Sequence, residues 1–182
     1  MFIDEVKKNT QKIKELYNAI REAFIELPHG PKHTVAAKEF HSRYDELAYP
    51  GGLERVLKSL KDKDYSVVDN VIEYLKVDPF FYRSGYSIEK MIMYLKHFVL
   101  NDLQEQEVSK LILRSIENGP RSFFLRYVRL ARRVNPELLL PGIRQVMSKK
   151  DNTPRVMMRA QLLLARIGEV KINMELIKKN SQ

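Results

Sequence analysis

The chain has 182 residues, of which 44% are hydrophobic and 30% are charged, and it contains no cysteine. These values are typical of a single folded domain and exclude an intrinsically disordered chain. The lack of cysteine excludes disulfides, thiolate metal ligands and cysteine nucleophiles, and it suits a reducing compartment. The N-terminus carries charge at once and no apolar stretch approaches about 20 residues, so we expect a cytoplasmic protein without a signal peptide or membrane contact.

Two helices are predicted at the N-terminus. Apolar side chains recur at three- and four-residue spacings over residues 2–26, which predicts a long amphipathic helix. Residues 27–31 include two prolines and a glycine and end that helix. A second helix is expected over residues 34–48. We interpret residues 1–49 as capping helices at one end of the domain.

From residue 50 to 182 the chain is predicted to form about four helix pairs. Asp64, Ser87 and Asn101 are expected N-caps, and Pro120, Pro136 and Pro154 suit first helical turns. Asn173 is expected to cap a short last helix after a stop at Gly168. The helices are expected over residues 53–61, 66–76, 88–98, 102–117, 120–134, 136–149 and 154–167.

The spacing of these helices predicts the fold class. Helix starts near residues 53, 87, 120 and 153 recur at about 33 residues, a period typical of helical-repeat solenoids. No useful run alternates apolar and polar residues, so a sheet is not expected. The sequence therefore predicts a single all-α domain, a short right-handed α-solenoid of antiparallel helix pairs with about 9 or 10 helices.

Residues 136–168 are similar to one HEAT repeat, and the earlier pairs match by period only. The features that fit the second half of such a repeat are Asp151, Pro154, Val156, Ala160, Leu163 or Leu164, Ile167 and Gly168. Met157 stands where the family usually has arginine. The resemblance implies an α-solenoid that presents a concave surface to a partner, and it implies no reaction.

The net charge of +9 is concentrated in residues 119–168. This segment holds eleven basic residues and two acidic ones, whereas the rest of the chain holds 21 of each sign. On a helical wheel Arg126, Arg129 and Arg133 fall within about 60°, and Arg155, Arg159 and Arg166 within about 40°. Arginine binds phosphates and carboxylates in a bidentate manner. The candidate surface for a nucleic acid or an acidic protein is Arg121, Arg126, Arg129, Arg132, Arg133, Arg155, Arg159 and Arg166. The alternative is an ordinary solvated face whose arginine stems cover the edge of the core.

Residues 78–86 form the most unusual loop. Phe81, Tyr82, Arg83 and Tyr86 could stack exposed bases. The interpretation that we favour is a plug between two repeats, with Gly85 turning the chain.

No catalytic, metal or cofactor motif is visible. No Asp or Glu stands at ligand spacing with His29 and His33, no H-E-x-x-H helix occurs, and no phosphate loop, nucleophile elbow or dinucleotide fingerprint is present. We therefore expect a non-catalytic HEAT-like binding or scaffold module without a metal or cofactor. One alternative is a HEAT-like DNA-processing enzyme of glycosylase type, which would need an acid facing the basic groove. Another is a helical partner or immunity protein in a toxin or phage-defence system.

Overall fold

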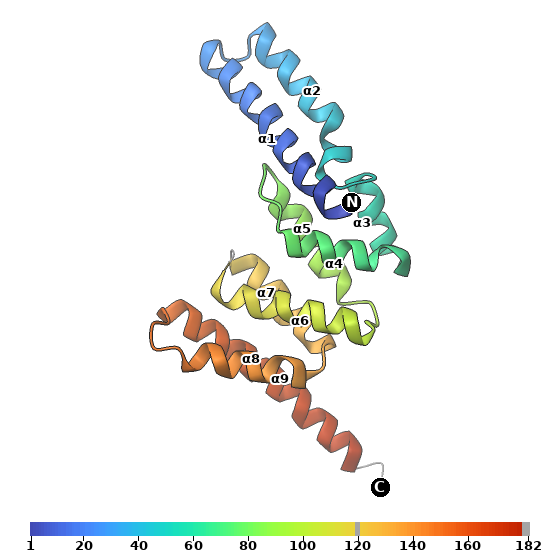
Figure 1. The fold of residues 1–182 in the computed structure, drawn as a ribbon, viewed down its shortest axis with the longest axis vertical. Helices are drawn as coiled ribbons and strands as arrows, with labels where there is room; N and C mark the ends of the chain where they lie inside the picture. Colours follow the sequence, from blue (N-terminus) through green and yellow to red (C-terminus); the bar gives the residue numbers. More distant parts are fainter. Residues whose placement is uncertain (119–120, 180–182) are drawn as a thin grey trace. The chain divides into compact units, whose positions relative to one another are not determined.

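The computed structural model describes residues 1–118 and 121–179, and there it shows nine α-helices, two short 3-10 helices and no strand (Figure 1). The all-α prediction is confirmed. The side chains of Arg121 and of residues 169–179 lie outside the described part. The chain divides into two compact units, Met1–Met91 and Ile92–Gln182, which we describe separately. The single domain and the solenoid arrangement stay predictions.

The first unit begins with a helical hairpin. Helix α1 (Phe2–Glu26) and helix α2 (Pro31–Ala48) lie side by side in Figure 1 and contact each other along their lengths. The apolar stripe predicted over residues 2–26 is confirmed, since Val6, Ile13 and Leu16 are buried. Helix α2 begins earlier than expected because Pro31 occupies its first turn, where a missing N–H costs nothing.

Helix α3 (Leu53–Lys61), the 3-10 helix η1 (Tyr65–Val67) and helix α4 (Val68–Val77) follow. Gly51 and Gly52 have φ angles of 84° and 97°, a region that favours glycine, and they make the turn into α3. The Asp64 carboxylate accepts a hydrogen bond from the Ser66 backbone N–H at 3.0 Å, which confirms Asp64 as a cap. The expected helix over 66–76 therefore starts as a 3-10 turn.

Helix α5 (Ser84–Leu95) starts earlier than the sequence indicated. Ser87, the expected N-cap, lies inside the helix and is buried, so that prediction is wrong. The Ser84 hydroxyl accepts a hydrogen bond from the Phe81 N–H at 3.1 Å and fixes the turn before the helix. The left-handed residue at this turn is Arg83, with φ of 65°, and not Gly85.

The second unit contains four helices after α5. They are α6 (Asp102–Glu117), α7 (Arg121–Leu130), α8 (Pro136–Ser148) and α9 (Pro154–Lys179), with the 3-10 helix η2 (Ala131–Arg133) after α7. Asn101 caps α6, since its side chain accepts from the Gln104 N–H at 2.9 Å. Pro136 and Pro154 begin their helices as predicted, whereas Pro120 lies outside the described residues.

The predicted stop at Gly168 is wrong. Helix α9 continues through Gly168 and through Asn173, the expected cap of a separate helix, to Lys179. A helical glycine costs only about 1 kcal/mol relative to alanine, and the residues after it include good helix formers such as Met, Glu, Leu and Lys. One unfavourable residue is therefore not enough to end a long helix.

Candidate binding surface

Helix α7 carries part of the candidate arginine surface, and one of its sides is buried whereas the other is exposed. Phe124, Tyr127, Val128 and Leu130 are buried, with exposures of 6% or less. Arg129 lies on the opposite, exposed side. Burial of the apolar face fixes the rotation of α7 about its axis, and this rotation directs Arg129 toward solvent.

Exposed arginines also lie on the neighbouring elements η2 and α9, which contact each other and α7. The exposed members of the predicted set are Arg129, Arg132, Arg133 and Arg155, whereas Arg126 and Arg166 are half-buried. Arg126, Arg132 and Arg166 also interact with other groups of the protein. The side chain of Arg121 lies outside the described part. The structure therefore brings most of the predicted arginines onto adjoining elements of one unit.

Arg159 differs from the predicted surface position, because its side chain is buried and only 3% of the residue is exposed. Its guanidinium donates to the backbone carbonyl oxygens of Ser115, Ile116 and Asn118 at 3.2, 3.5 and 3.4 Å. These carbonyls belong to the C-terminal end of α6, where helical acceptors have no partner of their own. Burial lowers the pKa of the Arg159 guanidinium, and the nearby charge of Arg155 adds to this. Arg159 is thus a structural cap and does not belong to the exposed set.

A shallow groove lies between α7 and α9. Its volume is about 220 Å³, and it is lined by Leu125, Val128, Arg129, Leu162, Ala165 and Arg166. We call it the α7–α9 groove. Its floor is aliphatic and part of that floor faces solvent, since Leu125 is 38% and Leu162 is 44% exposed. None of these six described residues carries a carboxylate, so they do not supply the acid that glycosylase-type chemistry would need.

The sequence prediction missed this groove, although a signal for it exists. Leu125, Val128 and Arg129 have the same spacing as Leu162, Ala165 and Arg166, and each arginine is followed by a buried residue, Leu130 or Ile167. The two helices thus present equivalent residues to one groove. Comparing the segments with each other, rather than counting arginines, could have revealed the two leucines.

The aromatic segment of the first unit, residues 78–86, is only partly packed inside that unit. Phe81 is 7% exposed, and the Tyr82 ring stacks on the Tyr17 ring with 4.5 Å between centroids. The Arg83 guanidinium lies 5.2 Å from the Tyr82 ring centre. Phe80 and Tyr86 remain largely exposed, and the Lys90 ammonium lies 4.5 Å from the Tyr86 ring centre. Phe81 and Tyr82 therefore act as packing residues of the first unit.

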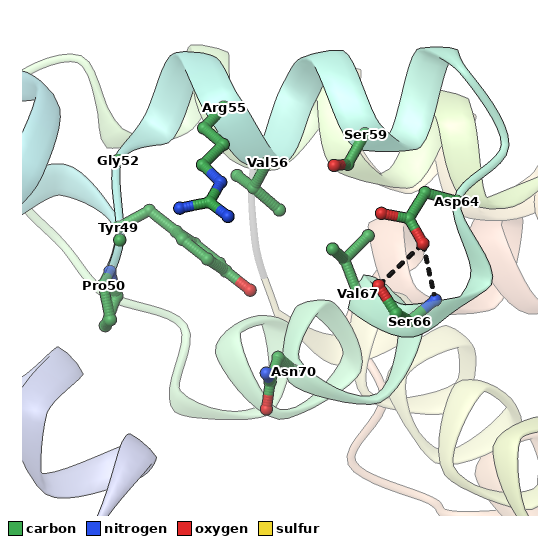
Figure 2. Close-up of a pocket in the computed structure, with 11 residues that line it drawn as sticks. Tyr49, Pro50, Gly52, Arg55, Val56, Ser59, Asp64, Ser66, Val67 and Asn70 are labelled. Carbon is green, nitrogen blue, oxygen red and sulfur yellow. Dashed lines mark hydrogen bonds between the residues drawn. The ribbon is translucent and has the colours of Figure 1, made fainter.

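The first unit also has a polar pocket of about 250 Å³ beside α3 (Figure 2). Figure 2 shows the Tyr49 hydroxyl and the Arg55 guanidinium directed into it. Asp64, its one carboxylate among the described lining residues, accepts two hydrogen bonds from Ser66. The described lining residues therefore supply a single carboxylate, which is engaged in a local turn, and no pair of acids for acid–base catalysis.

Among the described side chains, those of residues 1–118 and 122–168, no three His, Asp or Glu are grouped so as to hold a metal ion. His29 and His33 contact each other edge to face, with ring centroids 5.5 Å apart. In the same part of the chain no helix is long and apolar enough to cross a membrane.

Comparison with protein-family models, with curated proteins and with solved structures finds no match to this chain. The similarity to a HEAT repeat therefore rests on its own residues alone.

Proposed function

We propose that the protein is a non-catalytic, HEAT-like binding module whose C-terminal unit engages an anionic macromolecule through its arginines. The observation that carries the proposal is the position of Arg129, Arg133 and Arg155, which are exposed on adjoining elements α7, η2 and α9. The surrounding fifty residues hold only two acids, Glu137 and Asp151. Exposed arginines attract a polyanion over a distance comparable to the Debye length, about 8 Å at physiological salt.

The repeated spacing on α7 and α9 supports the repeat character of the module. Equivalent positions of two helices carry the same residue types, and Leu130 and Ile167 occupy the same buried place after each arginine. In repeat proteins such equivalence builds an extended surface from units that contact only their neighbours.

The test is a titration of the purified protein against labelled anionic probes while the salt concentration is varied. The probes are single-stranded DNA, double-stranded RNA and an acidic peptide, each followed by fluorescence anisotropy. Binding that persists at physiological salt and weakens linearly in log–log form with added salt supports the proposal. Absence of binding to every anionic probe at low salt contradicts it.

A further inference from the structure

We propose that the α7–α9 groove receives an acidic segment of a partner protein, which inserts one large apolar side chain between the two leucines and sets carboxylates against Arg129 and Arg166. The inference rests on the proposed function and names the class of partner. It concerns the groove itself, whereas the proposed function concerns the wider arginine surface.

The size of the groove fits a side-chain anchor. Clefts that bind small molecules usually enclose roughly 300–1,000 Å³. The α7–α9 groove, at about 220 Å³, is smaller and shallow. It suits one apolar side chain of a longer ligand better than a complete small molecule. A longer ligand could also reach the arginines that surround the groove.

The chemistry of the floor favours a protein over a nucleic acid. Grooves that bind single-stranded nucleic acid stack bases on aromatic rings, whereas the apolar lining here is Leu125, Val128, Leu162 and Ala165. Leu125 and Leu162 leave 38% and 44% of their surface in water. An aliphatic or aromatic side chain that covers them removes apolar surface from water on both partners, which is the largest favourable term in most protein association.

The arginines beside the groove indicate which partner residues lie next to the inserted apolar side chain. Arg129 and Arg166 each follow a groove leucine by four residues, so they lie one helical turn beyond it on the same face. Arg155 precedes Leu162 by seven residues, about 10 Å along the same side of α9. A segment with carboxylates on both sides of its apolar residue would therefore meet arginines at both ends of the groove.

The experiment uses the full chain and two peptides that differ at one position. Each is a fluorescein-labelled peptide of about 12 residues rich in Glu and Asp, a length too short to form a stable helix alone. One carries a central leucine and the other a central serine. Single-stranded DNA is the third probe. We expect the leucine peptide to bind about tenfold more tightly than the serine peptide, the ratio expected when roughly one leucine side chain is partly buried.

Matched variants identify the groove as the site. The double variant L125S/L162S should reduce binding of the leucine peptide to the level of the serine peptide and leave DNA binding unchanged. The variant L103S is the control, because Leu103 is 73% exposed in the same unit but lies outside the groove. R129Q/R166Q should weaken both peptides by about tenfold, whereas R144Q, a change of an exposed arginine on α8, should weaken neither appreciably.

The outcomes separate this inference from the proposed function. If the two peptides bind equally, or L125S/L162S acts like L103S, the inference is overturned while salt-dependent binding of DNA would still support the arginine surface. Tighter binding of DNA than of the leucine peptide, insensitive to the groove variants, also overturns it. If no probe binds at all, both proposals fail.

Discussion

The guanidinium carbon of Arg159 lies 5.0 Å from the centre of the Phe124 ring, so a cation from α9 covers an aromatic side chain of α7. The same guanidinium donates to the Ser115 carbonyl at the end of α6. One side chain therefore connects three helices of the C-terminal unit. Arg159 stabilises the scaffold, whereas Arg129, Arg133 and Arg155 are exposed.

Replacing Arg159 should destabilise the C-terminal unit. The change R159M keeps much of the apolar stem but removes the donors, which leaves buried carbonyls at the end of α6 without a partner; we expect a loss of about 1–3 kcal/mol. R155Q, four residues earlier and exposed, should change stability by less than about 0.5 kcal/mol. Urea unfolding followed by circular dichroism measures both, and equal stability of R159M and the wild type would contradict the capping role.

Replacing two glycines of the C-terminal unit by alanine should change the stability of the protein in opposite directions. A Cβ at Gly142 would lie 2.4 Å from Leu113 Cδ1 and 3.2 Å from its Cγ, so Leu113 would have to leave its rotamer. A Cβ at Gly168, inside α9, meets nothing within 4 Å. We expect G168A to gain up to about 1 kcal/mol from helix propensity, and G142A to lose about 1 kcal/mol because overpacking outweighs that gain. Thermal unfolding of the two variants tests the sign of each.

The Tyr74 phenol should make the first unit sensitive to alkali. Its hydroxyl donates to the Ala48 carbonyl at 2.8 Å, and burial raises the pKa of Tyr74 above its usual range. Since the folded state favours the neutral phenol, the stability that it contributes is complete below about pH 10, where an unfolded tyrosine titrates, and is lost as the pH rises further. Y74F should cost about 1 kcal/mol at pH 7. The free energy of unfolding of Y74F should then fall less steeply than that of the wild type between about pH 9 and 11. Urea unfolding at several pH values measures both, and a parallel fall with pH in the two proteins would contradict this role of Tyr74.

The aromatic segment offers a paired test of packing. Phe81 is 7% exposed and Phe80 is 82% exposed, although they are neighbours in the sequence. F81A should destabilise the protein by about 3 kcal/mol, the usual cost of a large core truncation. F80A should change stability by less than about 0.5 kcal/mol. If the two variants unfolded at the same denaturant concentration, Phe81 would not be the packing residue that its burial indicates.

The sequence predicted the helices well where local signals agree. Residues 2–26, 53–61 and 102–117 match α1, α3 and α6, because an amphipathic stripe, a turn and a cap or proline all indicate the same boundary. The prediction failed at Gly168, where a single glycine was taken as a stop. It also placed the start of α5 too late, because the turn before that helix depends on Ser84 and Arg83 and not on the residues usually expected there.

The candidate surface was predicted in part. A helical wheel places Arg159 with Arg155 and Arg166, but it also places Arg159 only about 60° from the buried Val156, within reach of the core. Whether such an arginine faces water depends on what the neighbouring helix offers, and here the end of α6 offers open carbonyls. The groove leucines were missed for a related reason, since only the contact of α7 with α9 brings Leu125 and Leu162 to one site.

The most direct test of the arginine surface compares two variants with the same change in net charge. One is R129Q/R133Q/R155Q, and the other is K7Q/K8Q/K14Q, which alters three exposed lysines of α1. The measurement is the slope of log binding constant against log salt concentration for single-stranded DNA. We expect the arginine variant to bind more weakly and to lose about 2 from the magnitude of the slope, since each phosphate contact to a single strand contributes about 0.7. The lysine variant should keep the wild-type slope. Equal slopes for the two variants would contradict the claim that these arginines form the binding surface.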